Sequence, residues 1–323
     1  MAAQDGTQVG SKRVLITGGA GFIGSHVADA FLARDCQVAI IDDLSTGRME
    51  NVPEGAELQQ LDIVDAAAVS RVVAAFAPDV VCHLAAQASV TVSVESPERD
   101  LAVNVQGTFN VLQAARETGA RLVFASTGGA LYGEDATLPS PETTPAEPLS
   151  PYGASKLAGE AYVGTWGRLY GIPNVVLRLG NVYGPRQNSK GEAGVVAIFS
   201  DLLRRGQAPM VFGDGQQTRD YIYVGDVAAA FVLAAGAGGA QTFNVGRGSE
   251  SSVLDLLEVL QPLAPTAVEP TFAPPRPGEL RRSALDSSRL RSTLGWEPRV
   301  QLQEGLAETY RFYADKVDTA EPL

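Results

Sequence analysis

Tyr152 and Lys156 stand four residues apart in the segment SPYGASK (150–156). Ser150 and Pro151 make a typical helix start, because a side-chain cap is followed by a residue whose φ is already helical. Tyr152 then falls in the first turn, with Lys156 on the same helical face. A lysine ammonium near a phenol lowers the pKa of the tyrosine. The pair therefore predicts a general base for an alcohol proton; the spacing alone leaves a surface Tyr–Lys pair open as the alternative.

A glycine-rich turn lies upstream of this pair. RVLIT (13–17) is an apolar run typical of a buried strand, and HVADAFLARD (26–35) has the apolar period of a helix. Gly18, Gly21 and Gly24 stand between them at three-residue intervals. Such glycines permit a tight turn, the approach of a pyrophosphate to backbone amides, and close packing of the helix on the strand. A plain strand–helix turn is the alternative for the glycines alone.

Asp42 ends the next predicted strand, QVAIID (37–42). An acidic residue about 20 positions beyond such a glycine turn accepts a hydrogen bond from a ribose hydroxyl of a dinucleotide. Its carboxylate would repel a 2′-phosphate, so the sequence favours NAD over NADP.

Strands and helices alternate through the first half, which predicts an α/β fold with a doubly wound parallel sheet and helices on both faces. We expect a third strand to end at Asp62, a long helix over 97–119, and a sixth strand to end at Asn181. Ligands of such sheets bind beyond the carboxyl ends of the strands. The side chains that we expect there are those of Asp62, Ile63, Leu84, Ala85, Ala86, Ser126 and Thr127.

Beyond Asn181 the chain becomes rich in Gly and Pro, which indicates a smaller, mixed second lobe. The prediction is an NAD-binding domain of residues 1–181 plus about 223–249, and a substrate lobe of about 182–222 plus 250–323. Asp226 is predicted to cap a helix. The proline-broken tail after Arg276 is not expected to reach the core, and an amphipathic helix is expected at 303–316.

The composition excludes several classes of function. A net charge of −12 disfavours binding to nucleic acid or to anionic membranes. The start of the chain is too polar for a signal peptide, and no apolar run reaches the length of a membrane span. Cys36 and Cys82 have no metal-binding spacing and are interpreted as core residues of a cytoplasmic protein. His26 and His83 are interpreted as structural, and no metal site is expected.

Taken in order, the motifs TGGAGFIGS (17–25), DDLSTG (42–47), HLAAQASV (83–90), STGGALYG (126–133) and YGASK resemble the extended short-chain dehydrogenase/reductase family. GNVYGPRQ, FGDGQQTRDYIYVGDVA, RPGELRRS and LGWEP in the second half are similar to bacterial UDP-glucose 4-epimerases. The resemblance implies tightly bound NAD, a UDP-sugar substrate and a homodimer formed through the helices at 97–119 and 150–171.

The resemblance also implies the residues of both sites. Asp42 and Asp43 would hold the adenosine ribose, Asp62 the adenine amino group, and Lys156 the nicotinamide ribose. The implied cofactor site comprises Gly18, Gly21, Phe22, Ile23, Gly24, Asp42, Asp43, Ser45, Thr46, Gly47, Asp62, Ile63, Leu84, Ala85, Ala86, Gln87, Asn104, Tyr152, Lys156 and Leu179. The implied substrate site comprises Thr127, Gly128, Tyr152, Asn181, Gly194, Val195, Phe212, Arg219, Tyr221, Arg276 and Ser283, with the two arginines on the diphosphate.

The implied reaction inverts C4 of the sugar through a 4-keto intermediate, with Tyr152 as the base. Many relatives have a catalytic hydroxyl where this chain has Gly128, so we expect Thr127, or next Ser126, to supply it. The absence of a carboxylate at Gly128 and Gly129 disfavours the sister dehydratases and decarboxylases. Glu192 disfavours a uronate sugar, and the small Ser283 predicts that N-acetylated sugars are accepted. A non-catalytic NAD-binding sensor remains the alternative from another class.

Overall fold

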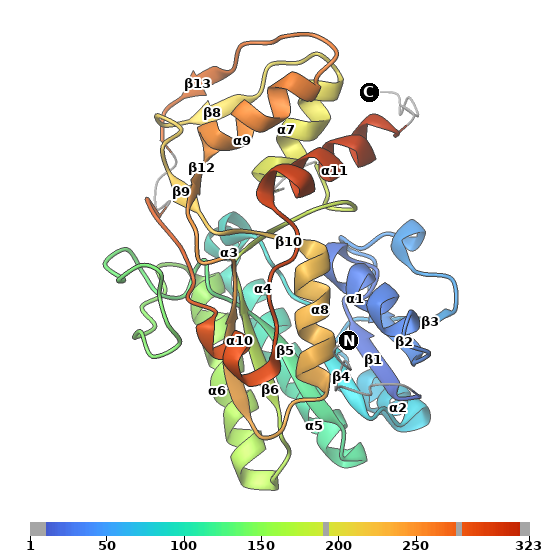
Figure 1. Cartoon of the computed structure of the whole chain (residues 1–323). Helices are drawn as coiled ribbons and strands as arrows, with labels where there is room; N and C mark the ends of the chain where they lie inside the picture. The colour runs from blue at the N-terminus through green and yellow to red at the C-terminus, as the bar shows by residue number, and fades with distance from the viewer. Residues whose placement is uncertain (1–10, 190–193, 276–279, 317–323) are drawn as a thin grey trace, which may run out of the picture.

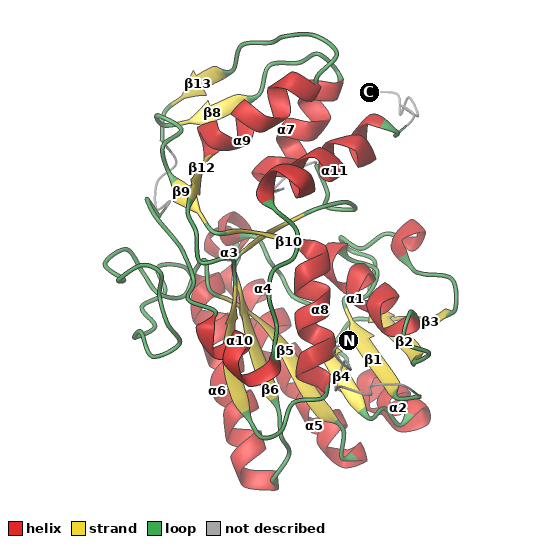
Figure 2. Ribbon diagram, viewed as in Figure 1, coloured by secondary structure: helices red, strands yellow, loops and turns green. Residues whose placement is uncertain are grey.

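The computed structural model describes residues 11–189, 194–275 and 280–316. Its centre is a seven-stranded sheet in which every strand pair is parallel (Figures 1 and 2). The order is β11-β6-β5-β4-β1-β2-β3. The strands are β1 Arg13–Thr17, β2 Gln37–Asp42, β3 Ala56–Gln60, β4 Val80–His83, β5 Arg121–Thr127, β6 Val175–Leu179 and β11 Gln241–Val245.

Helices cover both faces of this sheet, as the alternation of elements predicts. The two faces follow from the period of the strands, since Val14 and Ile16 of β1 join one buried cluster and Leu15 joins the other. One face is covered by α1 Phe22–Leu32 and α8 Val224–Ala235. The other is covered by α2 Ala66–Phe76, α5 Thr108–Thr118 and α6 Pro151–Tyr170. The doubly wound fold is therefore confirmed.

The long helix expected over 97–119 is present but is not regular. It consists of α4 Pro97–Leu101, a π-helical stretch Ala102–Gly107 and α5, after a short α3 Val90–Glu95. Such π stretches occur inside α-helices and are frequent at functional sites. This one carries Asn104, which the sequence places in the cofactor site.

A smaller group of elements packs around a third apolar cluster. Its helices are α7 Val195–Arg204, α9 Val253–Leu260 and α11 Leu302–Ala314. The two-stranded pairs are β8 Met210–Phe212 with β13 Thr271–Ala273, β9 Thr218–Arg219 with β12 Ser251–Ser252, and β7 Asn181–Tyr183 with β10 Tyr221–Tyr223. In Figure 1 these helices lie above the carboxyl ends of the large sheet, with α11 at the end of the described chain.

The prediction that the tail stays out of the core is wrong. Leu285, Leu290 and Trp296 are all buried, and α10 Ser288–Leu294 packs on β11. These residues lie in the proline-free stretch between Pro277 and Pro298, whose apolar side chains pack into the core. The indole of Trp296 donates to the Asp226 carbonyl at 2.9 Å.

Asp226 does not cap a helix as predicted. It lies in the first turn of α8, which begins at Val224, and its carboxylate accepts from the backbone N–H of Arg299 and Val300 at 3.0 and 3.1 Å. The side chain therefore fastens the tail to α8. Two strands also end earlier than expected, β3 at Gln60 and β6 at Leu179.

Among the described residues, no helix is long and apolar enough to cross a membrane. Cys36 and Cys82 are both buried in the same apolar cluster, as core residues would be.

Candidate active site

The helix α6 places Tyr152 and Lys156 against the carboxyl end of β5. Its start is the predicted one, since the Ser150 hydroxyl accepts from the backbone N–H of Gly153 at 3.2 Å. One turn later the Lys156 ammonium donates to the Ala125 carbonyl at 3.1 Å. The lysine is buried, whereas Tyr152 keeps part of its surface accessible.

The electrostatics of this pair differ from the prediction. Burial lowers the pKa of Lys156 to about 8, although the nearby Asp100 and Glu160 carboxylates act to raise it. Burial also raises the pKa of Tyr152 to about 12, against the opposing effect of a hydrogen bond with Thr127. The prediction of a lowered tyrosine pKa is therefore wrong for the protein by itself, because desolvation and the nearby Asp100 carboxylate outweigh the influence of Thr127.

The structure distinguishes the two candidate hydroxyls. The Thr127 hydroxyl is close enough to the phenol of Tyr152 to act on it, and this interaction lowers the pKa of the phenol. The hydroxyl of the preceding residue, Ser126, donates instead to the Glu160 carboxylate at 2.5 Å, in a buried position. Consecutive strand residues point to opposite faces, so only one of the two can face the phenol, and that one is Thr127.

Gly128 and Gly129 continue the chain from Thr127 and leave no room for side chains. A Cβ atom on Gly128 would lie 2.5 Å from a methyl carbon of Leu285, and one on Gly129 would lie 3.1 Å from Oδ1 of Asn181. The backbone N–H of Gly128 donates to the Leu179 carbonyl at 2.7 Å.

A buried polar cluster that sequence reasoning did not find surrounds Asn104. Asn104 donates to Oδ1 of Asp100, to the Gln87 carbonyl and to the Ser155 hydroxyl at 2.9, 2.9 and 3.1 Å, and its Oδ1 accepts from the backbone N–H of Gln87 at 2.8 Å. The Ser155 hydroxyl donates to the carbonyl of Tyr152. Asp100 is buried; the only hint in the sequence is its position four residues before Asn104.

The glycine turn has the shape that a dinucleotide needs. Gly18 has φ +72° and a Cβ there would lie 2.7 Å from the backbone N of Ala85. Gly21 is the N-cap of α1 and offers no side chain to the free N–H groups of the first turn, which also lacks acidic residues. An added Cβ at Gly24 would collide with the Gly18 carbonyl. The N-terminus of α1 is thus left open for an anionic group.

Asp42 supports this turn directly. Its carboxylate accepts from the backbone N–H of Ala20 at 3.0 Å and of Leu44 at 2.9 Å, and burial raises its pKa. Asp43 is exposed and accepts from the N–H and hydroxyl of Ser45 at 2.9 and 2.7 Å.

The remaining predicted cofactor residues follow the strand ends. Asp62 is exposed just after β3, while the neighbouring Ile63 is buried against Gly107 of the π-helical stretch. Others lie at the ends of β2, β4 and β6 or in the first turn of α1: Phe22, Ile23, Thr46, Gly47, Leu84, Ala86, Gln87 and Leu179.

The predicted substrate residues are divided between sheet and lobe. Asn181 starts β7 beside Gly129, Gly194 caps α7 ahead of Val195, and Phe212 ends β8. Arg219, in β9, is partly buried and donates to the Thr218 carbonyl at 2.8 Å. Ser283 is 7% exposed, and Tyr221 belongs to the buried cluster of the lobe. Arg276, Gly191 and Glu192 lie outside the described residues.

Both histidines have structural contacts, as interpreted. His83 lies between the hydroxyls of Thr17 and Thr108 at 2.6 and 2.9 Å, and burial lowers its pKa to about 3. The ring of His26 contacts the Pro185 carbonyl at 3.0 Å. In the described part of the chain, no group of three or more His, Cys, Asp or Glu side chains is arranged to hold a metal ion.

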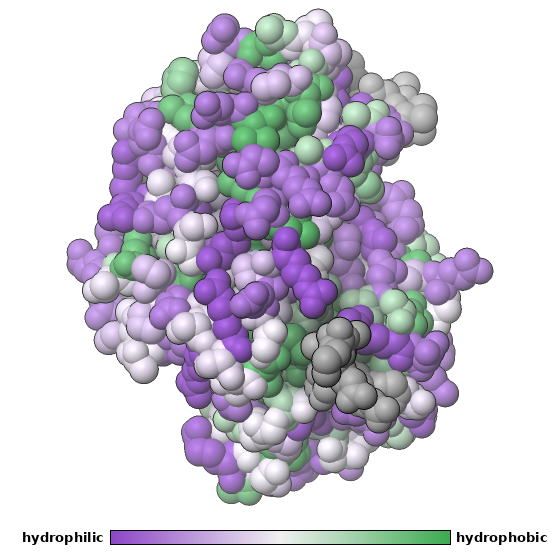
Figure 3. Space-filling model, in the orientation of Figure 1, coloured by the Kyte–Doolittle hydropathy of each residue, from purple (hydrophilic) through white to green (hydrophobic). Residues whose placement is uncertain are grey.

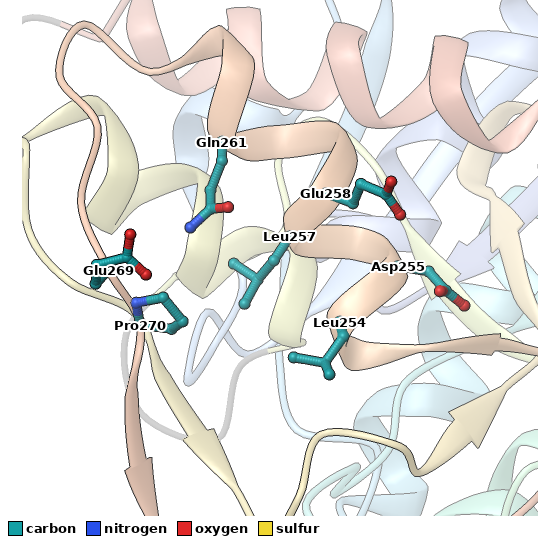
Figure 4. Close-up of a pocket in the computed structure, with 7 residues that line it drawn as sticks. All are labelled: Leu254, Asp255, Leu257, Glu258, Gln261, Glu269 and Pro270. Atoms are coloured by element: carbon teal, nitrogen blue, oxygen red, sulfur yellow. The ribbon is translucent and has the colours of Figure 1, made fainter.

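A hollow of about 350 Å³ lies on the smaller lobe between α9 and the start of β13 (Figure 4). It is lined by Leu254, Asp255, Leu257, Glu258, Gln261, Glu269 and Pro270, and in Figure 4 the carboxylates of Asp255 and Glu258 lie on the side of α9 away from Glu269. None of the predicted site residues lines this hollow, so it is separate from the candidate active site.

Comparison with known proteins agrees with this geometry. Residues 14–246 match the NAD dependent epimerase/dehydratase family. A UDP-glucose 4-epimerase of Mycolicibacterium smegmatis is 48% identical over 94% of this chain and 99% of its own. The crystal structure of the Thermotoga maritima UDP-glucose 4-epimerase with UDP-glucose has a TM-score of 0.91 and 43% identity, covering 93% of this chain and 98% of that one. The Thermus thermophilus UDP-glucose 4-epimerase in complex with NAD has a TM-score of 0.89 and 46% identity, covering 94% and 100%. The chain belongs to the NAD-dependent epimerase/dehydratase family.

Proposed function

We propose that this protein is an isomerase that interconverts UDP-glucose and UDP-galactose by inverting C4 of the sugar with bound NAD. The observation that carries the proposal is the placement of Tyr152 next to Thr127, with the buried Lys156 one turn further along α6, at the carboxyl edge of the parallel sheet. The relatives whose names state this reaction match nearly the whole chain.

The residues of the glycine turn fit NAD. The open first turn of α1 suits a pyrophosphate, and Asp42 and Asp43 at the end of β2 suit a ribose. NAD held there would supply the hydride acceptor of the reaction. The pKa of Tyr152 is about 12 in the chain alone, so the phenolate that the reaction needs would have to be favoured by positive charge in the loaded site.

Tyr152 removes the proton of the sugar 4-hydroxyl in this proposal, and Thr127 shares a hydrogen bond with the same oxygen. Lys156, one turn further along α6, donates from its ammonium to the Ala125 carbonyl and, in this proposal, would also bond the nicotinamide ribose. After the sugar has turned over about its diphosphate, the same phenol returns the proton to the 4-keto oxygen. One base serves both directions, and the reaction has no net redox change.

A dehydratase is the second candidate within the family, and the site argues against it. Elimination of a sugar hydroxyl requires a further acid and base beside the reacting carbons. The positions after Thr127 are Gly128 and Gly129, where Leu285 and Asn181 fill the space that side chains would need. The Glu160 carboxylate, which accepts from the neighbouring Ser126, is already paired with Arg178 at 2.7 Å.

N-acetylated UDP-hexosamines are proposed as additional substrates, since Ser283 is small and lies in the tail that packs against Gly128 through Leu285. A UDP-uronate is less compatible with the chain because Glu192 would repel its carboxylate.

We further propose a homodimer. Phe109, Tyr162, Trp166 and Tyr170 form a row of edge-to-face aromatic contacts on α5 and α6. Tyr162 and Tyr170 are 40% and 42% exposed, and Leu169 is 64% exposed. The face drawn in Figure 3 is mainly hydrophilic apart from patches, the largest over the upper lobe. An exposed aromatic face of two long helices fits a four-helix contact with a second copy.

The domain division and the cellular location are also proposals. Strands up to β6, together with α8 and β11, build the NAD-binding domain, and the elements around α7, α9 and α11 build the substrate lobe. The burial of Cys36 and Cys82 in one apolar cluster, as small core residues, is the support for a cytoplasmic location.

Incubation of the purified protein with UDP-glucose tests the proposal, with UDP-galactose measured by NMR. We expect product without added NAD, and NAD released on denaturation. Released NAD with no product from any UDP-hexose would instead favour a non-catalytic NAD-binding sensor. A stoichiometric need for added NAD would favour a dehydrogenase.

A further inference from the structure

A chain of buried polar side chains links helix α6 to strands β5, β6 and β11. Its centre is Arg178 of β6, which is 9% exposed. The guanidinium donates from Nε to both oxygens of Glu160 at 2.9 and 3.1 Å and from Nη2 to Oε2 at 2.7 Å. On its other side, Nη1 donates to the Tyr132 hydroxyl at 2.9 Å. One planar side chain therefore contacts the helix and the loop after β5 at once.

Glu160 connects this chain to the proposed catalytic centre. It lies one turn after Lys156 on α6, and its Oε1 also accepts from the Ser126 hydroxyl at 2.5 Å. Ser126 is paired with Arg178 across β5 and β6, and it directly precedes Thr127. Ser126 thus ties β5 to α6 on the face opposite Thr127, and this contact fixes the position of Thr127 relative to Tyr152 on the same helix.

The outer end of the chain reaches the tail. The Tyr132 hydroxyl donates to Oδ1 of Asn244 in β11 at 2.7 Å. The Asn244 amide nitrogen donates to the carbonyls of Ser140 and Asp286 at 2.8 and 3.2 Å. The loop between Thr127 and α6 is consequently fastened to β11 and to the segment that carries Leu285.

Stability alone does not account for the buried ion pair of Arg178 and Glu160. Taking two charges out of water has a penalty that often equals or exceeds their attraction, and apolar replacements of a whole pair are frequently as stable. An arginine contributes directional hydrogen bonds, because the donors of its guanidinium have fixed positions in one plane. The pair is best placed to fix the geometry of the strand end that it contacts.

We propose that Arg178 is a positioning residue of this active site, which holds Thr127 in register with Tyr152 by joining Glu160 on α6 to Tyr132 on the following loop. This inference rests on the proposed function. Arg178 touches neither the phenol nor the Thr127 hydroxyl in the structure and acts through Ser126 and Tyr132. A displacement of about 1 Å between reacting groups can lower a rate about 100-fold, so a small loss of register has a large effect on turnover.

Two variants test the proposal, Tyr132→Phe and Arg178→Lys. Tyr132→Phe removes the hydroxyl and keeps the aromatic ring. Arg178→Lys keeps the positive charge, but a lysine cannot bind Glu160 and Tyr132 at the same time. We expect kcat for UDP-glucose to fall at least about tenfold in each, as for misplaced catalytic groups, with KM and the amount of bound NAD unchanged. Arg204→Lys is the matched control, since Arg204 pairs with Asp201 at 2.8 Å with 10% of its side chain exposed, far along the chain from Thr127. It should lower the melting temperature and leave kcat as in the wild type.

Unchanged kcat in Tyr132→Phe overturns the proposal, and this variant decides the matter if Arg178→Lys does not fold. A rise in KM or a loss of NAD that accounts for the fall in turnover also overturns it, because a general structural role would act in that way. If the wild-type protein itself does not interconvert UDP-glucose and UDP-galactose, the proposed function has failed, which is a separate outcome.

Discussion

Leu285 lies directly against Gly128. Its methyl carbons stand 2.5 and 2.6 Å from the position that a Cβ on residue 128 would take. Leu285 is 1% exposed, and its backbone N–H donates to the buried Asp220 carboxylate at 3.1 Å. A parallel bridge to Ser140 holds the same residue. Leu285, which belongs to the C-terminal part of the chain, therefore limits the size of the side chain at residue 128.

The first prediction is that Gly128→Ser destabilises the protein and that Leu285→Ala partly relieves it. The serine overpacks a full site, at a typical cost of about 1–3 kcal/mol, whereas Leu285→Ala leaves a cavity at a cost of about 2–5 kcal/mol. In the double variant the new side chain occupies part of that cavity. Thermal or denaturant unfolding of all four proteins gives the coupling energy. Simple additivity of the two changes would show that the residues do not compete for space.

Features that depend on neighbouring residues could be predicted from the sequence, whereas contacts between distant segments could not. The glycine turn, the start of α6 at Ser150 and the Tyr152–Lys156 spacing depend on neighbouring residues, so their patterns predict them. The contact of Leu285 with Gly128 and the pairing of Arg178 with Glu160 depend on how distant segments meet, which no local pattern records. The raised pKa of Tyr152 cannot be predicted from the sequence pattern for the same reason, because burial is a property of the folded chain.

The second prediction separates the two hydroxyls. Thr127→Ala removes the hydroxyl next to the phenol and should lower kcat by more than about tenfold, below the range of 100-fold or more typical of general acid–base catalysis. Binding of UDP should change little, since the Thr127 side chain contacts the phenol. Steady-state kinetics with a UDP-binding titration measures both. Ser126→Ala is the matched comparison, and a larger loss of kcat there than in Thr127→Ala would assign the proton-sharing role to Ser126.

The third prediction concerns Lys156. Its fall in pKa from 10.5 to about 8 corresponds to about 3 kcal/mol against the charged form in the folded state. Below pH 8 the lysine is charged in both states, so the folded state carries the full penalty. Between pH 8 and 10.5 the unfolded chain binds more protons, and stability rises with pH. Lys156→Met should therefore inactivate the enzyme yet raise its melting temperature at pH 7.

The gain from Lys156→Met should shrink as the pH approaches 10. Melting curves of variant and wild type at pH 7, 8 and 9 measure it. Lys12→Met, at a partly exposed position outside the site, is the control and should show no such pH-dependent gain. A variant that is less stable than the wild type at pH 7 would mean that the contacts of the ammonium with the Ala125 carbonyl and the Phe124 ring outweigh its burial.

The fourth prediction concerns the choice of sugar. Ser283 is buried in the tail two residues before Leu285, so a larger side chain there must displace its surroundings. Ser283→Tyr should lower kcat/KM for UDP-N-acetylglucosamine by at least about 100-fold, since closing a pocket by a ring exceeds the 10–200-fold effect of one methylene. Activity with UDP-glucose should fall much less, because that sugar lacks the acetamido group. Ser283→Ala is the control for the lost hydroxyl. Comparable losses of kcat/KM for both sugars in Ser283→Tyr would place residue 283 outside the pocket that selects the sugar. The range of sugars that the enzyme accepts would then depend on other residues.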